Sequence, residues 1–175
     1  MSIGAILLAV GIPSFRSTIA SNRLTSTTND LVGSLNQARS EAIRRGVRVT
    51  VCKSSDRKTC ATSGNWDQGW ITYFSTTPSI ATGATGETVI AVAEREANST
   101  VINGSTDVVR YVSFSSDGTA RKISGAGTGG GTLRVCESSS ALGNDKRARD
   151  IEVSAVGRLS TTPPPAPVAA TCPAP

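Results

Sequence analysis

Histidine is absent from the 175 residues of this chain. Its absence excludes Ser–His and Cys–His nucleophile pairs, imidazole metal sites and the most common general base. Aromatic residues are also scarce, with three Phe, two Trp and two Tyr. The chain has room for one domain with a modest core. We therefore expect a protein that is not an enzyme and that uses no cofactor, metal or small-molecule substrate.

Acidic residues are fewer than basic ones, 13 against 18, which gives a net charge of +5. A charge of this size suits an anionic partner such as DNA but is far below that of a nucleic-acid-binding arm. Solvated surface is the simpler interpretation of each basic group taken alone. The excess lies largely in two groups, Arg39, Arg44, Arg45 and Arg48 in the first and Lys146, Arg147, Arg149 and Arg158 in the second.

The four cysteines form no CxxC motif, and without histidine a zinc site is not expected. Three pairings are possible, and locality favours Cys52 with Cys60 and Cys136 with Cys172. The second bond would tie the C-terminal tail to the body of the domain. An even number of cysteines in a small basic protein indicates an oxidising compartment such as the periplasm or cell surface. Four reduced thiols in a cytosolic protein are the alternative.

The sequence also has no apolar segment long enough to span a membrane by itself, because the uncharged apolar run covers only residues 1–15. A membrane-spanning helix needs about 20 such residues, and the run lacks the basic region and cleavage site of a signal peptide. It is typical of the second half of a membrane helix. Apolar residues at steps of 3, 4 and 7 continue the pattern, so we predict a helix from about residue 2 to 45. Pro13 predicts a kink, and Gly46, after two arginines, predicts the end.

After Gly46 the apolar residues alternate with a period of two, which predicts β-strands. The predicted strands lie near residues 47–52, 69–74, 88–94, 99–103, 109–114, 132–136 and 151–154. Residues 161–175 hold six prolines and should form an extended tail that joins no sheet centrally. The prediction is an α+β protein: an N-terminal helix (1–46) packed on an antiparallel sheet domain (47–160), followed by a tail (161–175) tethered by Cys172. Trp66 and Trp70 are expected in the core.

Several stretches, in this order, resemble the GspH/FimT family of minor type IV pilins and type II secretion pseudopilins. The most characteristic is LNQARSEAIRRG at residues 35–46, followed by VTVC at 49–52 and IEVSAVGR at 151–158. Further matches are residues 12–15, Trp66 with residues 69–71, Phe114 with Gly118, and Leu133 with Cys136. Family members begin with a basic leader and Gly-Phe-Thr-Leu-Ile-Glu, which this sequence lacks, so we expect its printed start to lie within the membrane helix. The alternative is a protein that is not processed and inserted in the usual way.

The resemblance implies a pilin-like fold and a structural subunit that helps to initiate or cap a type IV pilus. It implies storage as a single-pass inner-membrane protein with a periplasmic domain, and then a place in the pilus at the cell surface. Its partners would be other minor pilins and the major pilin. The residues expected to pack in the filament core are Ile6, Leu7, Leu8, Val10, Ile12 and Phe15.

Two alternatives come with the same resemblance. One is a GspH-like pseudopilin that assembles with secretion pseudopilins in a type II system. The other is a FimT-like pilin that captures DNA in natural transformation, with Lys146, Arg147, Arg149 and Arg158 as the residues that would bind it. The DNA-binding signature of FimT proteins is Gly-Arg-x-Arg, whereas this chain reads Gly157-Arg158-Leu159-Ser160 and so lacks the second arginine.

Overall fold

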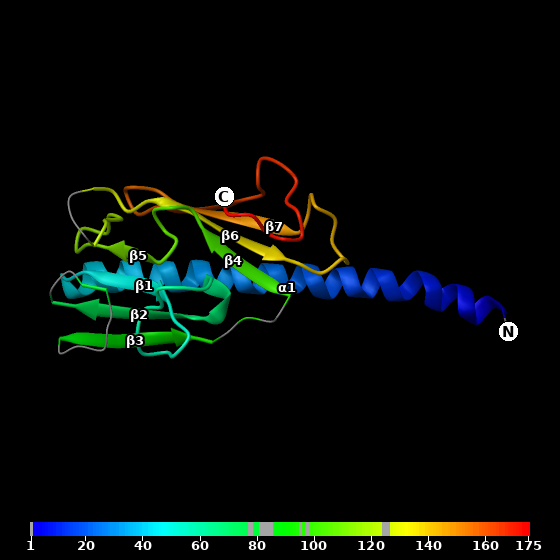
Figure 1. Cartoon of the computed structure of the whole chain (residues 1–175), viewed down its shortest axis with the longest axis horizontal. Helices are drawn as coiled ribbons and strands as arrows, with labels where there is room; N and C mark the ends of the chain where they lie inside the picture. Colours follow the sequence, from blue (N-terminus) through cyan, green and yellow to red (C-terminus); the bar gives the residue numbers. More distant parts are fainter. Residues whose placement is uncertain (1, 77–78, 81–85, 95, 97–98, 124–126) are drawn as a thin grey trace.

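The structure is a computed structural model. It describes residues 2–76, 79–80, 86–94, 96, 99–123 and 127–175, with side chains from Ser14 onward. A single long helix, α1 (Ser2–Arg45), begins the chain. Gly46 ends it with a φ of +68°, a conformation that favours glycine, and its N–H donates to the carbonyl of Ala42 at 3.0 Å. The predicted helix is confirmed. Figure 1 shows that its C-terminal half lies along the domain while its N-terminal part projects beyond it and bends gently.

Two four-stranded antiparallel sheets pack against this helix, where the sequence led us to expect one sheet. The first has the order β3-β2-β1-β5 and the second the order β4-β6-β7-β8. Figure 1 shows both sheets against the same stretch of α1. The strands of the first sheet are β1 (Val49–Lys53), β2 (Trp70–Ser75), β3 (Glu87–Ala93) and β5 (Tyr111–Phe114). Those of the second are β4 (Thr100–Gly104), β6 (Gly131–Glu137), β7 (Ala148–Val153) and β8 (Leu159–Thr162).

Strand β8 was not predicted, because its residues adjoin the proline-rich tail. It pairs antiparallel with β7, with Asp150 opposite Thr162 and Val153 opposite Leu159. Since β8 is the last strand of its sheet, the proline that follows it interrupts no ladder of hydrogen bonds. The β-domain therefore extends two residues beyond the predicted boundary at residue 160.

The core lies between the helix and both sheets. One stripe of α1 is buried, at Leu24, Leu31, Leu35, Ala38 and Ala42, and it packs into a cluster shared with both sheets. The two tryptophans belong to this cluster, as expected, and each is 1% exposed. Their indole N–H groups donate to the carbonyl of Val108 at 3.1 Å and to Ser34 Oγ at 2.9 Å. A buried indole N–H needs such a partner. The contact of Trp70 with Ser34 also joins the first sheet to the helix.

Disulfides join Cys52 to Cys60 and Cys136 to Cys172, the pairing that locality in the sequence favours. The second bond holds the tail over the outer face of the second sheet. There Val168 is buried against the disulfide, and Asn103 Nδ2 donates to the carbonyl of Cys172 at 2.6 Å. The tail is thus part of the folded domain from Val168 onward.

Candidate functional site

The N-terminal part of α1 is the most prominent surface feature of the molecule. The first buried helix residue among those with described side chains is Ala20, whereas Phe15 is 69% exposed and Ile19 is 44% exposed. Phe15 was expected to pack in a filament, and its exposure leaves it free to contact another chain. The other five residues of that expectation, Ile6, Leu7, Leu8, Val10 and Ile12, have side chains outside the described part.

Below this projection, α1 keeps one face exposed along the domain. Between residues 17 and 43 the exposed positions carry a single charged residue, Asp30; the others are mainly Ser, Thr, Asn, Gln and Gly. Burying ionised groups is costly, so a face with one charge can be covered by another helix with little penalty. The helix thus combines a buried stripe that belongs to its own domain with a nearly uncharged stripe that is open to a partner.

Beyond Ser40, charges gather at the C-terminal end of this helix. Glu41 accepts hydrogen bonds from Arg44 and Arg45, which lower the pKa of its carboxyl. The guanidinium of Arg45 also lies 4.6 Å from the centre of the Phe74 ring. Positive charge at a helix C-terminus complements the helix dipole, so these arginines stabilise the helix end. The other two cations of the first basic group, Arg39 and Arg48, donate hydrogen bonds to the domain, so all four make structural contacts.

In the second basic group, Arg147 is buried, and this corrects its assignment as a DNA-binding candidate. Its side chain lies inside the loop between β6 and β7, and the residue is 5% exposed. The guanidinium donates to the carbonyls of Glu137, Ser139 and Leu142. An arginine enclosed in this way cannot reach a phosphate without unfolding the loop. Lys146, one residue earlier, is exposed.

The remaining cations of that group lie at different places. Lys146 and Arg149 are at the start of β7, and Arg149 is half-buried with Nη1 donating to the carbonyl of Ala148 at 2.8 Å. Arg158 follows the turn at the other end, where its N–H donates to Ser154 Oγ at 3.0 Å. Ser154 lies five positions beyond Arg149 along the extended chain, which is about 16 Å at the usual rise per residue. The structure therefore does not gather the four residues into one site.

A carboxylate lies next to Arg158. Glu152, Ser154, Arg158 and Ser160 together line a surface pocket of about 240 Å³, and Ser160 pairs with Glu152 across β7 and β8. The serine that replaces the second arginine of the signature thus lies beside a negative charge. A phosphate would be repelled by Glu152 in this pocket.

Other carboxylates have structural roles. Asp56 accepts hydrogen bonds from the side chain and N–H of Thr59 and the N–H of Lys58, and these lower the pKa of its carboxyl. Asp117 receives comparable bonds from Ser115 and Thr119, which likewise lower its pKa. Asp67 accepts from the N–H of Ile102 at 3.2 Å. In the part of the chain that the structure describes, no group of three His, Cys, Asp or Glu residues could hold a metal ion.

One set of surface residues was missed by the sequence analysis. At the end of the domain where α1 emerges, Arg16, Ile19, Ala20 and Arg23 of the helix and residues 139–141 of the β6–β7 loop line a groove of about 470 Å³. The helix residues follow the spacing i, i+3, i+4, i+7, which places them on one face. The charges were visible in the sequence, but the loop that meets them is more than 110 residues away, so only the fold reveals the groove.

Within the described residues, no helix has both the length and the apolar character needed to cross a bilayer. No curated protein sequence matches this chain significantly. Among solved structures, the chain is similar to the type IV minor pilin FimU of Pseudomonas aeruginosa strain PAO1 in two crystal forms. For the P21 form the TM-score is 0.56 at 19% identity, covering 81% of this chain and 90% of that one. For the P65 form the TM-score is 0.50 at 17% identity, covering 83% and 92%.

These matches show the fold, which is that of a type IV pilin. The family is shown by a family model, "Type II transport protein GspH", which matches residues 27–157 and so covers most of the chain. The matched range includes the buried stripe of α1 from Leu31 onward, seven strands of the two sheets and Gly157. The chain belongs to the GspH family of type IV minor pilins and type II pseudopilins.

Proposed function

We propose that this protein is a minor type IV pilin, a structural subunit that takes part in initiating or capping the assembly of a pilus. The observation that carries the proposal is the long helix, exposed at Phe15 and Ile19 and nearly uncharged along its open face, attached to a domain with the fold of a minor pilin. A surface of this kind is suited to pack against the helices of neighbouring subunits, because it brings apolar area and few charges into the contact.

The same proposal assigns the protein to the inner membrane before assembly, with the β-domain in the periplasm, and to the pilus afterwards. The two disulfides support an oxidising compartment of this type. The partners are other minor pilins and the major pilin. The protein acts through contacts between subunits and catalyses no reaction.

Chemical cross-linking in native membranes, followed by purification of the full chain and mass spectrometry of its partners, tests this function. The expected result is recovery of minor pilins together with the major pilin. Phe15→Ala should weaken this recovery while the free energy of unfolding changes by no more than about 0.5 kcal/mol, because the side chain is largely exposed. A deletion strain with normal surface pili would contradict the proposal.

A pseudopilin of a type II secretion system is the second candidate, and the description of the matching family model favours it. The same cross-linking experiment separates the two functions. Recovery of secretion pseudopilins in place of pilins, together with loss of secreted enzymes in a deletion strain, would assign the chain to the secretion system.

We leave DNA capture out of the proposed function. Arg147 is buried, Arg158 shares its pocket with Glu152, and Lys146 lies at the other end of β7. Retardation of DNA in gel-shift experiments at low salt that is lost in Arg158→Ala would bring this function back, since phosphate contacts are strongest at low ionic strength.

A further inference from the structure

The charge-free apolar run ends very close to the point where the domain begins. Residues 1–15 carry no charge, Arg16 is the first charged residue, and Ala20 is already buried against the domain. Four residues of helix correspond to about 6 Å. If the apolar run lies in the hydrocarbon of a membrane, the underside of the domain must lie at the depth of the lipid headgroups, which form a layer about 5–8 Å thick on each side.

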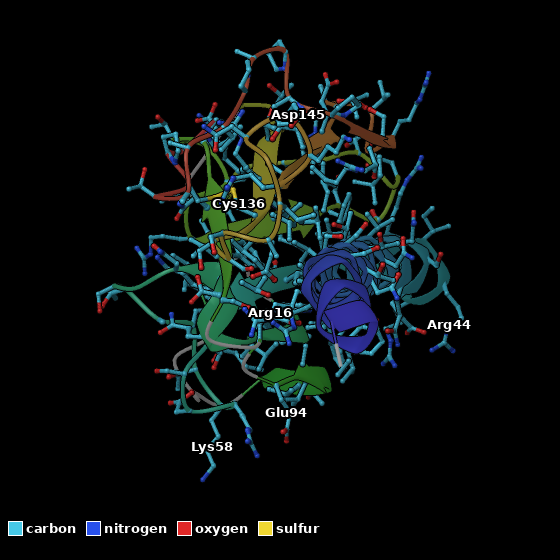
Figure 2. The ribbon with its side chains drawn as sticks, turned by 90° about the vertical axis from the view of Figure 1, so that its right-hand side faces the viewer. Arg16, Arg44, Lys58, Glu94, Cys136 and Asp145 are labelled. Atoms are coloured by element: carbon cyan, nitrogen blue, oxygen red, sulfur yellow. A yellow bond between two sulfur atoms is a disulfide. The ribbon has the colours of Figure 1, made fainter. Side chains whose placement is uncertain are left out.

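The underside is built from the loop between β6 and β7 (residues 138–147), which rests against α1 and leaves a groove on each side. Arg16 lines the first groove, of about 470 Å³, together with residues 139–141. Lys146 lines the second, of about 430 Å³, together with Ser17 and Ser21. Figure 2 looks at the molecule from this end and shows Arg16 beside the helix and Asp145 on the loop.

Among the described residues of this surface, Arg16 and Lys146 are the cations whose side chains make no ion pair or hydrogen bond, and both are exposed. Arg23 is already engaged: Nη1 donates to Ser99 Oγ at 2.6 Å and lies 3.8 Å from Oε2 of Glu137. Glu137 is fully buried, and its Oε1 accepts from the N–H of Ser139 at 3.2 Å. The Arg23–Glu137 contact therefore fixes the loop against the helix, and the charges of the two side chains compensate each other.

Negative charge is sparse here. Asp145 is the one carboxylate among residues 138–147, and residues 14–29 of the helix carry none. Serine, threonine and asparagine side chains supply much of the remaining lining of the second groove. Hydroxyl and amide groups donate hydrogen bonds to phosphate oxygens, so the grooves offer cations and neutral donors together. In addition, helix side chains tilt toward the N-terminus, which directs Arg16 toward the membrane.

We propose that the underside of the domain is a surface for anionic phospholipids, with Arg16 and Lys146 binding headgroup phosphates on either side of the 138–147 loop. The inference rests on the proposed function, since it needs residues 1–15 to lie in a membrane. Binding orients the domain on the bilayer with α1 upright and the exposed stripe of the helix open to a neighbouring subunit. The surface that contacts other pilins and the surface that contacts lipid are thereby different parts of the molecule.

Flotation of the full chain with two kinds of vesicle tests the proposal, one of phosphatidylcholine alone and one that also contains phosphatidylglycerol. The quantity measured is the ratio of the two partition coefficients. The expected result is a ratio clearly above one, reduced about fivefold by Arg16→Gln and about fivefold by Lys146→Gln, which corresponds to about 1 kcal/mol per cation. Partition into phosphatidylcholine alone should be unchanged in both variants, because it depends on the apolar run.

Lys58→Gln is the matched control, since Lys58 is an exposed cation of the connection between β1 and β2, and Figure 2 shows it at the opposite edge of the molecule from Asp145. It should leave the ratio unchanged. The proposal is overturned if Lys58→Gln lowers the ratio as much as Arg16→Gln, or if the unaltered chain shows no preference for phosphatidylglycerol. Loss of the preference on adding inorganic phosphate at constant ionic strength would also overturn it, because the grooves would then bind a free anion.

Failure of the proposed function gives a different pattern. If the chain binds neither kind of vesicle and recovers no pilin on cross-linking, the proposed function itself is refuted. A chain that partitions equally into both kinds of vesicle and still recovers pilins refutes the lipid surface alone.

Discussion

Arg39 of the helix donates to the carbonyl of Gly118 at 3.0 Å through Nε, and to that of Val156 at 3.4 Å through Nη2. One side chain thus joins α1 to the turns that follow strands β5 and β7, which belong to different sheets. The two turns also touch each other. A Cβ on Gly157, whose φ is +76°, would lie 2.0 Å from the carbonyl oxygen of Gly118, so only glycine fits there.

Arg39→Ala should therefore lower the free energy of unfolding by about 2 kcal/mol, because it removes charge-assisted hydrogen bonds to two carbonyls. Arg39→Lys keeps the charge but has a single nitrogen, and should remain about 1 kcal/mol below the parent. Chemical denaturation measures both. The control is Arg44→Ala on the same helix, whose exposed ion pair contributes about 0.5 kcal/mol at most. Equal losses for Arg39→Ala and Arg44→Ala would contradict the assigned role.

Substitution of the neighbours Lys146 and Arg147 should change the stability of the protein by very different amounts. Arg147→Ala leaves the carbonyls of Glu137, Ser139 and Leu142 without their donor, and we expect a loss of about 3 kcal/mol in stability. Lys146→Ala removes an exposed side chain and should change stability by less than about 0.5 kcal/mol. Thermal unfolding of the two variants, side by side, checks the difference. A stable, native-like Arg147→Ala protein would mean that the loop does not depend on the buried guanidinium.

The two disulfides should differ in their effect on stability. Cys136–Cys172 closes 36 residues and Cys52–Cys60 closes 8. In the loop-entropy description, removing the longer one costs about 4 kcal/mol and the shorter one about 2.5 kcal/mol. The double Cys→Ser variant of each pair, compared by its denaturant midpoint, tests the order. Mass spectrometry of a non-reduced digest checks the pairing itself, and a Cys60–Cys136 peptide would contradict it.

Acid should destabilise the domain through Asp56 and Asp117. The main cause at Asp56 is a hydrogen bond from the side chain of Thr59, and at Asp117 one from the side chain of Ser115. These bonds lower the pKa of each carboxyl in the folded protein. A carboxyl whose pKa is lower in the folded than in the unfolded protein stabilises the fold at pH values above its unfolded pKa of about 4. That stabilisation is lost as the pH falls below this value. Stability measured against pH should decline below about pH 4, and less steeply in Asp117→Asn. An identical slope in that variant would exclude Asp117 as a source.

Regular local patterns in the sequence predicted most of the elements. The boundaries of α1 follow from apolar spacing and from Gly46, and both agree with the structure to within a residue. The seven predicted strands all exist, because alternation of side chains is a local property. Strand β8 was missed because Leu159 to Thr162 has no clear alternation and leads directly into Pro163. The division into two sheets depends on which distant strands pair, which periodicity does not encode.

The site was less predictable than the fold. Lys146 and Arg147 are neighbours of the same charge, yet the first is exposed and the second buried. Arg147 is buried because backbone carbonyls inside the loop accept hydrogen bonds from its guanidinium. In the same way, Arg16 and Arg23 acquire a partner surface only when residues 139–141 come to lie beside them. Phe15, which ends the apolar run, is exposed in the structure, as its expected place in a filament contact requires.

The buried stripe of α1, from Leu24 to Ala42, has a mechanical consequence. It spans about 27 Å of helix, and its side chains contact both sheets at once. A force that pulls the helix along its axis must therefore shear all of these contacts together, with no single contact at which the helix could begin to peel away. At the end of the stripe, Gly46 leads within three residues into β1, an inner strand of its sheet. Tension carried by the helix thus passes directly into the middle of the β-domain, where strands on both sides share the load.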